Sequence, residues 1–153
     1  MKLLSLNKKT VLIIIFLSLV KLSAFSANYY ISTSGSDSNL GTTVGSPKLT
    51  LASVFSTYNL GVGDIINVAA GTYSETGIVV GSDDEGFTIQ GAALSGGVPT
   101  SIFDASSTAR WLLLNNTNND NIIISKLTII YPFHETETND IPSNIIVILN
   151  LSS

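Results

Sequence analysis

The amino-acid sequence predicts an all-β fold made of short strands. Only 12% of the residues are charged, and glycine, serine, threonine, asparagine and β-branched residues are abundant, a composition typical of β proteins. Along most of the chain, short apolar clusters alternate with turns rich in Gly, Asp and Asn. Such a dense succession of strands and turns indicates a sandwich, a barrel or a solenoid.

The spacing of the apolar clusters favours the solenoid. The interval from Ile65 to Phe87 is about 22 residues and that from Ile122 to Ile145 is about 23 residues, which lies in the range of repeat architectures. The interval from Phe87 to Ile122 is longer, about 35 residues, so a regular repeat requires an insertion. We place this insertion at Ala92–Thr100. On spacing alone, a sandwich remains the alternative.

The segment 1–26 is predicted to form a secretory signal peptide. Lys2, Lys8 and Lys9 precede the apolar run Val11–Val20, and Ser23-Ala24-Phe25-Ser26 provides small residues for cleavage after Ser26. A membrane anchor is the alternative, but a spanning helix needs about 20 apolar residues, and Lys21 ends this run at about half that length. The mature protein is therefore expected to be exported and free of the membrane.

Removal of the signal peptide leaves a strongly acidic chain. Lys48, Arg110 and Lys126 are the basic residues that remain against eleven acidic residues, which gives a net charge of −8. This charge argues against nucleic acid as a partner, because nucleic-acid binding requires a basic surface. The chain has no cysteine, so packing and hydrogen bonds must hold it together. We expect one monomeric domain of about 127 residues.

The segment 27–62 is predicted to hold a short strand, a turn and a helix. Tyr29–Ser32 is β-prone, and Ser34–Gly41 has turn composition. Asp37 alone makes this turn a poor calcium site. The helix is predicted to begin at Ser46-Pro47, with Pro47 near its first turn, Thr50 or Ser46 as N-cap and Gly61 at the C′ position. Its apolar face, which would cover one end of a β core, consists of Leu51, Val54, Phe55 and Tyr58.

The segment 63–153 is predicted to form the stacked strands. Gly63–Tyr73 is interpreted as the first rung, with Asp64 as a turn residue that leads into its strand. The expected strands are Ile65–Val68, Ile78–Val80, Phe87–Ile89, Ile102–Phe103, Trp111–Leu114, Ile122–Ile124, Leu127–Ile130 and Ile145–Leu149. The expected turns include Ser82–Gly86, Ser95–Pro99 and Asn115–Asn121.

Five segments, in this order, resemble the N-terminal part of a known family. They are NYYISTSGSDSNLGT (28–42), SPKLTLASVF (46–55), GDIINVAAGTY (63–73), GFTIQGA (86–92) and NIIISKLTII (121–130). Together they are similar to secreted bacterial right-handed parallel β-helix proteins of the pectate-lyase-like superfold. The resemblance covers residues 28–131, and Lys126 stands where the family's repeat usually has glycine.

The resemblance implies a right-handed parallel β-helix of about three coils, closed at its N-terminal end by the amphipathic helix. It also implies an extracellular or cell-surface location and a polysaccharide as substrate or ligand. Enzymes of the family build their groove over many more coils, some with calcium, so we expect this chain to be truncated. No catalytic position of the family can be assigned here: the catalytic residues are unknown, and no cofactor or metal site is expected.

Four groups of residues are candidates for chemistry, and each has a structural alternative that we prefer. Asp83-Asp84-Glu85 has the composition of a calcium or glycosidase site, but its glycine neighbours favour a solvated turn. His134 beside Glu135 has no nucleophile partner. Arg110-Trp111 could hold a uronic acid, although Trp111 more simply begins a strand. Lys126 is expected to point outward from its strand, on a sheet face that in the resembling family can line a carbohydrate groove.

The function expected from the sequence is that of the N-terminal segment of an exported β-helix protein that acts on or binds polysaccharide, without a complete active site. The alternative is a non-catalytic surface protein, similar to an adhesin, that binds glycans or proteins.

The absence of a complete active site predicts that this chain alone does not cleave polysaccharides. Incubation with polygalacturonate and alginate should release no unsaturated uronate, measured as the absorbance of the new double bond. An increase in that absorbance above a heat-denatured control would contradict the prediction.

Overall fold

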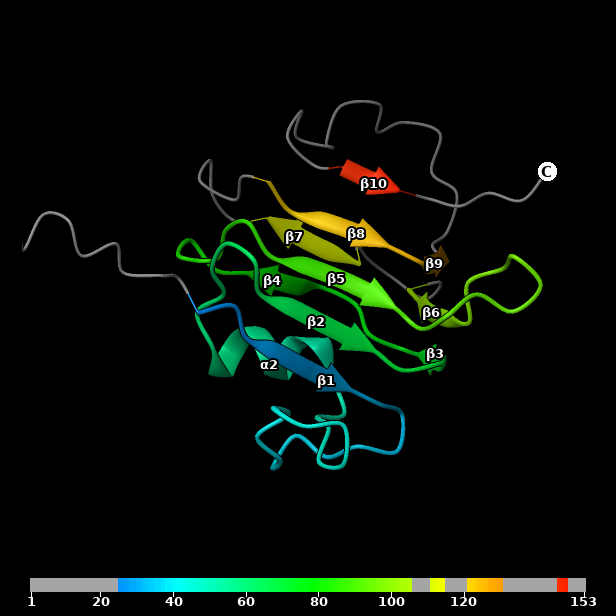
Figure 1. The fold of residues 1–153 in the computed structure, drawn as a ribbon, viewed down its shortest axis with the longest axis horizontal. Helices are drawn as coiled ribbons and strands as arrows, with labels where there is room; N and C mark the ends of the chain where they lie inside the picture. The colour runs from blue at the N-terminus through cyan, green and yellow to red at the C-terminus, as the bar shows by residue number, and fades with distance from the viewer. Residues whose placement is uncertain (1–24, 106–110, 115–120, 131–145, 149–153) are drawn as a thin grey trace, which may run out of the picture.

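The computed structural model describes residues 25–105, 111–114, 121–130 and 146–148 (Figure 1). The predicted signal peptide lies outside these residues except for Phe25 and Ser26. Within the described part, the protein consists mainly of strands in parallel sheets with one helix, α2 (Leu51–Thr57).

Three parallel sheets, which we call A, B and C, contain the strands of the described residues. Sheet A has the order β1 (Asn28–Ile31), β2 (Ile65–Val68), β5 (Thr88–Gly91), β8 (Ile123–Ser125) and β10 (Ile146–Ile148). Sheet B consists of β3 (Gly71–Tyr73), β6 (Ser101–Asp104) and β9 (Leu127–Ile130), and sheet C of β4 (Ile78–Val80) and β7 (Leu112–Leu114).

The chain passes through the sheets in a repeating order. From β2 in sheet A it continues to β3 in sheet B and β4 in sheet C, and then returns to sheet A at β5. Ile65 pairs with Thr88, Thr88 with Ile123 and Ile123 with Ile146, so two equal repeats of about 23 residues flank one of about 35 residues. The long repeat contains the connection 92–100, where the sequence predicts an insertion. All of these pairs are parallel, unlike the antiparallel pairs of a sandwich.

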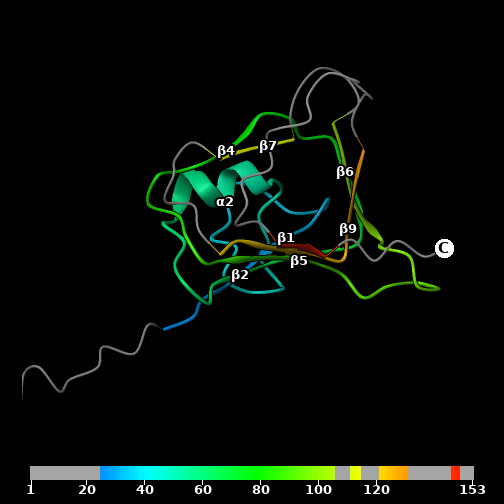
Figure 2. The ribbon, with the colours of Figure 1, turned by 90° about the horizontal axis from the view of Figure 1, so that it is seen from above.

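The core lies between the three sheets (Figure 2). In strands β1, β2 and β5, alternate residues are buried, so residues in register stack from strand to strand. In sheet A the buried residues Ile66 and Ile89 pair with each other, and Ile89 pairs with Ile124. From the other sheets come Tyr73, Phe103 and Trp111, whose successive ring centroids are 5.1 and 4.9 Å apart.

Helix α2 covers the end of the core at which β1 lies (Figures 1 and 2). Leu51 and Val54 are fully buried, and the Phe55 ring packs edge-on against Phe87 at 5.4 Å. The helical face predicted from the sequence is therefore the face that packs. Thr50 is the N-cap, and its side chain accepts a hydrogen bond from the Ser53 N–H. The alternative cap residue, Ser46, precedes the helix by more than a turn.

The outer edge of β1 is closed by the segment that leads into the helix. The Tyr30 N–H donates to the Gly41 carbonyl at 2.7 Å, the Lys48 N–H donates to the Tyr30 carbonyl at 2.9 Å, and the Ser32 N–H donates to the Lys48 carbonyl at 2.9 Å. These bonds satisfy backbone groups that would otherwise offer an open edge to another chain. Pro47, predicted to lie near the first helical turn, belongs to this extended segment.

Gly61 does not occupy the C′ position of the helix, which is where the sequence pattern placed it. The helix ends at the C-cap Tyr58, and Gly61 instead begins the turn that ends at Asp64. The Gly61 N–H donates to Asp64 Oδ2 at 2.9 Å, and the Asp64 N–H donates to the Gly61 carbonyl at 3.0 Å. Asp64 Oδ1 also accepts from the Ala27 N–H at 2.7 Å. This confirms Asp64 as a turn residue and joins the first rung to β1.

Strand bounds deviate slightly from the prediction, and the predicted first rung divides between two sheets. Gly71–Tyr73 forms β3, a separate strand in sheet B, whereas the sequence pattern places it at the end of the first rung. The chain leaves sheet A after Val68 and turns at Ala69 and Ala70. The sequence pattern breaks at Ala69-Ala70-Gly71 and resumes at Thr72-Tyr73, but the change of sheet at this break depends on the pairing of β3 with β6, which lies far away in the chain.

Replacement of Leu51 or Phe55 by Asp is expected to expose the end of the core and to cause aggregation. A buried charge without a partner costs several kcal/mol, and loss of the helix leaves the end of the core open. Size-exclusion chromatography and urea unfolding measure both effects. Ala52→Asp is the matched control, because Ala52 is an exposed residue of the same helix. If both core variants stay monomeric and as stable as the parent, the helix does not act as a cap.

Candidate functional site

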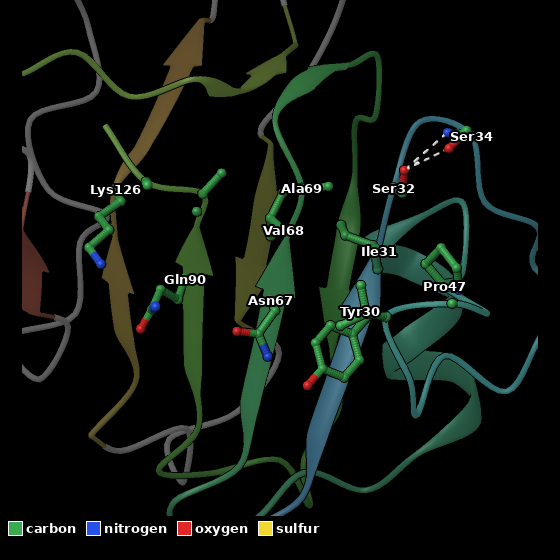
Figure 3. Close-up of a pocket in the computed structure, with 15 residues that line it drawn as sticks. Tyr30, Ile31, Ser32, Ser34, Pro47, Asn67, Val68, Ala69, Gln90 and Lys126 are labelled. Carbon is green, nitrogen blue, oxygen red and sulfur yellow. Dashed lines mark hydrogen bonds between the residues drawn. The ribbon is translucent and has the colours of Figure 1, made fainter. Parts of the chain in front are cut away.

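A groove of about 650 Å³ crosses the outer face of sheet A near the carboxyl ends of its strands (Figure 3). Tyr30, Asn67, Gln90 and Lys126 form its floor. The segment that closes β1 contributes Val44 and Pro47 to one side, and the β5–β6 connection contributes Ala92 and Ala93.

The floor of the groove is a row of side chains at equivalent positions on neighbouring strands. Tyr30 pairs with Asn67, Asn67 with Gln90, and Gln90 with Ser125, the residue before Lys126. Each of these strand positions alternates with a buried one, so its side chain points outward. With neighbouring strands about 4.8 Å apart, the row extends about 14 Å along the stack.

Several polar atoms of this row have no hydrogen-bond partner in the described part of the chain. They are the Tyr30 hydroxyl, the Gln90 amide and Lys126 Nζ. Asn67 Nδ2 donates to Asn28 Oδ1 at 3.3 Å and to the Tyr29 carbonyl at 3.2 Å, which leaves its side-chain oxygen toward the groove. The row therefore presents donors, acceptors and one aromatic ring to a ligand.

Lys126 supplies the positive charge of the groove. Lys48 is buried, with 3% of its surface exposed, and its Nζ donates to the Asp37 carbonyl at 3.2 Å and to Ser53 Oγ at 3.1 Å. Arg110 lies outside the described residues. Among the described residues that line the groove, none is acidic. An anionic group would thus meet one cation and no fixed negative charge there.

Lys126 does not continue a strand, contrary to the sequence prediction. It forms the corner between β8 and β9 with a φ of +56°, a conformation that costs a residue with a side chain about 1 kcal/mol more than glycine. Its side chain lines the groove beyond Gln90, at the end of the groove farther from Tyr30 (Figure 3). Its carbonyl oxygen packs over Gly91, where an added Cβ would lie 1.8 Å away. The corner is therefore tightly determined by packing.

The acidic cluster Asp83-Asp84-Glu85 forms a turn, as predicted, but it is not solvated throughout. Asp84 is buried, with 3% of its surface exposed. Its carboxylate accepts from the Leu60 N–H at 2.7 Å and from the Gly81 N–H at 2.9 Å. The sequence does not indicate this burial, because one of the donors comes from a turn in a different part of the chain. The carboxylate is committed to the backbone rather than available for catalysis.

Two other candidates are not supported as sites. Trp111 has 5% of its surface exposed and packs against Phe103, so its ring cannot stack on a sugar. This agrees with the structural interpretation, since Trp111 immediately precedes β7. Its neighbour Arg110, and His134 with Glu135, lie outside the described residues.

No group of three or more His, Cys, Asp or Glu side chains in the described part of the chain is arranged to hold a metal ion. Asp37 is committed to the helix entry: its carboxylate accepts from the Leu49 N–H at 3.0 Å, and from the N–H and hydroxyl of Thr50 at 2.9 and 3.0 Å. These three hydrogen bonds are consistent with a structural turn at Ser34–Gly41.

Glu75, between β3 and β4, completes the N-terminal end of α2. Its two carboxylate oxygens accept from the N–H groups of Leu51 and Ala52 at 2.9 and 3.1 Å. Burial raises the pKa of the Glu75 carboxyl, these two N–H groups lower it, and Asp37 raises it, with a net increase. Burial also raises the pKa of Tyr73 to about 12, so its hydroxyl stays protonated and donates to the Ala69 carbonyl.

Sequence reasoning finds Lys126 but misses Tyr30, Asn67 and Gln90. A usable signal exists in the repeats: Ile66-Asn67-Val68 and Ile89-Gln90-Gly91 place an amide side chain at the same position of successive repeats. This signal can be recognised only when the register of the strands is known. Ile65 pairs with Thr88, so the true repeat is slightly longer than the predicted interval from Ile65 to Phe87.

Comparison of the chain with protein-family models, with curated proteins and with solved structures found no match. Within the described residues, no helix has the length and apolar character needed to cross a membrane.

The raised pKa of Glu75 predicts a specific dependence of stability on pH. Because the pKa is higher in the folded chain, the protonated carboxyl favours folding, and this contribution is fully present only below the unfolded pKa. It is lost as the pH rises through the folded pKa. The stability advantage of the parent over Glu75→Gln should therefore be larger at about pH 4 than at about pH 7, measured by urea unfolding.

Glu85→Gln, which removes an exposed carboxylate remote from the helix end, is the control for this measurement. Equal pH profiles for the parent and Glu75→Gln would show that the carboxyl does not contribute in this way.

Proposed function

We propose that the described residues form a segment of a right-handed parallel β-helix. Two observations support this proposal. The chain passes through three parallel sheets in a fixed order, and the corners at Lys126 and at Ala69-Ala70 are short. In Figure 2 the chain runs counterclockwise through sheets A, B and C as it rises toward the viewer, which is the right-handed sense of parallel crossovers. The resemblance of residues 28–131 to the family points the same way.

We further propose that this exported protein binds an extended acidic polysaccharide along the groove on sheet A. The observation that carries the proposal is the row of outward side chains, in which the polar atoms of Tyr30, Gln90 and Lys126 have no hydrogen-bond partner within the described chain. The Tyr30 ring offers a face on which a sugar can stack, and the amides of Asn67 and Gln90 match sugar hydroxyls. Lys126 pairs with a carboxylate of the ligand.

Binding without cleavage accounts for the composition of the groove better than catalysis does. Glycoside hydrolysis uses a pair of carboxyl groups beside the bond that breaks, and the described lining residues include neither a carboxylate nor a histidine. Lys126 is a candidate base for a lyase. The second candidate function is therefore a contribution to β-elimination. The first candidate function, binding without cleavage, corresponds to a surface protein that recognises glycans.

Lys126→Gly tests the binding proposal without disturbing the corner. Glycine adopts the positive φ freely, so the variant should be as stable as the parent or more stable, by up to about 1 kcal/mol. Its affinity for polygalacturonate or alginate should fall by about tenfold, a loss of about 1.4 kcal/mol. Calorimetric titration measures the affinity, and urea unfolding the stability. Added salt should weaken binding by the parent more than by the variant.

Lys126→Arg is the matched control, because it keeps the charge at the same backbone position and should retain most of the affinity. A neutral glucan should bind more weakly than either acidic polymer. If Lys126→Gly binds as tightly as the parent, or if the parent binds none of these polymers, the proposed function is wrong.

A further inference from the structure

The connection between β5 and β6 is longer than the fold requires. The same corner, from sheet A to sheet B, is closed by Ala69-Ala70 after β2 and by Lys126 alone after β8. After β5 it takes the whole segment Ala92–Thr100. We call this segment the β5–β6 hairpin.

The β5–β6 hairpin is an ordered element. Its tip is a closed turn in which the Ser95 N–H donates to the Val98 carbonyl at 3.0 Å, and the Val98 N–H donates to the Ser95 carbonyl at 3.1 Å. The two residues between them, Gly96 and Gly97, have φ values of +59° and +85°. Two successive left-handed residues characterise the turn type that suits a tight hairpin, and glycine accommodates it best.

The base of the hairpin is joined to the first rung through Ser101. The buried Ser101 hydroxyl accepts from the Ala92 N–H at 2.9 Å and lies 3.0 and 3.1 Å from the carbonyl oxygens of Val68 and Ala69, to which it donates. The Gly71 N–H donates to the Thr100 carbonyl at 2.9 Å. The hairpin therefore leaves the stack in a fixed direction.

The hairpin contributes little to the core and borders the groove. None of residues 93–99 is buried, and in both ribbon views the segment projects from the corner between sheets A and B (Figures 1 and 2). Ala92 and Ala93 line the groove, as does Lys126, which occupies the equivalent corner of the next coil. A segment that adds little to the core, yet has hydrogen bonds at its tip and base and borders a groove, is of the kind that determines recognition.

We infer that the β5–β6 hairpin is a specificity element of the groove, which rests on the proposed function. It occupies the space on the carboxyl-end side of the strands beside Gln90 and Lys126, so a ligand has to lie along the stack. It excludes bulky substituents that project from the ligand toward that side. The groove therefore selects a linear, unsubstituted acidic polysaccharide over the same polymer carrying O-acetyl groups, by steric exclusion rather than by added attraction.

A deletion of residues 93–99 tests this inference. It leaves Ala92-Thr100 between β5 and β6, the same length as Ala69-Ala70 between β2 and β3, and it retains the backbone groups that bond to Ser101 and Gly71. The probes are whichever of polygalacturonate and alginate the parent binds more tightly, and the same polymer after chemical O-acetylation. The parent should prefer the unsubstituted polymer by about tenfold, and the deletion should reduce this preference to less than about threefold.

Two further variants allow for a deletion that does not fold. Gly96→Val combined with Gly97→Val strains the left-handed turn without a clash, because no atom lies within 4 Å of a Cβ built at either position. This double variant should also reduce the preference. Gly96→Asn retains the turn and should discriminate as the parent does.

The outcomes separate the inference from the proposed function. If the parent binds the acidic polymer through Lys126 but has equal affinity for the O-acetylated form, the inference is wrong and the binding function stands. The same conclusion follows if neither the deletion nor the double valine variant reduces the preference. If the parent binds neither acidic polymer, both are wrong.

Discussion

The parallel, in-register pairing of the sheet A strands is the constraint on which the rest of the structure depends. Because Ile66, Ile89 and Ile124 occupy equivalent positions, their side chains stack inside the protein, and a shift of one residue would turn the whole set toward solvent. The same register fixes the outer face. Asn67 and Gln90 form a row there because their inward neighbours form a ladder, so core and groove are two consequences of one pairing pattern.

A stack of parallel strands leaves its first strand with unpaired backbone groups, and much of the N-terminal part of the chain deals with this. The segment before α2 bonds to the edge of β1, and the helix covers the apolar end of the core. The free N–H groups at the start of the helix are in turn taken up by Asp37, Glu75 and Thr50. The carboxylates of Asp37 and Glu75 thus stabilise the start of the helix that covers the end of the core. In an acidic sequence, such residues can be mistaken for functional groups.

Two of the corners between sheets A and B differ from the shortest link that the fold requires. At the corner between β8 and β9 the positive φ favours glycine, yet the chain has Lys126 there, whose side chain lines the groove and whose carbonyl oxygen packs against Gly91. At the preceding corner the fold needs only a short link and the chain provides the β5–β6 hairpin. Both departures from the minimal corner lie beside the same groove, and under the proposed function their local cost to stability would be offset by a gain in binding.

Local chemistry determined much of what could be read from the sequence. Apolar clusters, turn residues and the face formed by Leu51, Val54 and Phe55 were sufficient to predict strands, insertion and helix, because each depends on near neighbours in the chain. The burial of Asp84, the separation of β3 from β2 and the corner at Lys126 depend on partners far away in the chain, or on the register between coils. The groove is of the same kind: Tyr30, Asn67 and Gln90 do not stand out in the sequence, and only the stacking of successive strands of sheet A places them in one row beside Lys126.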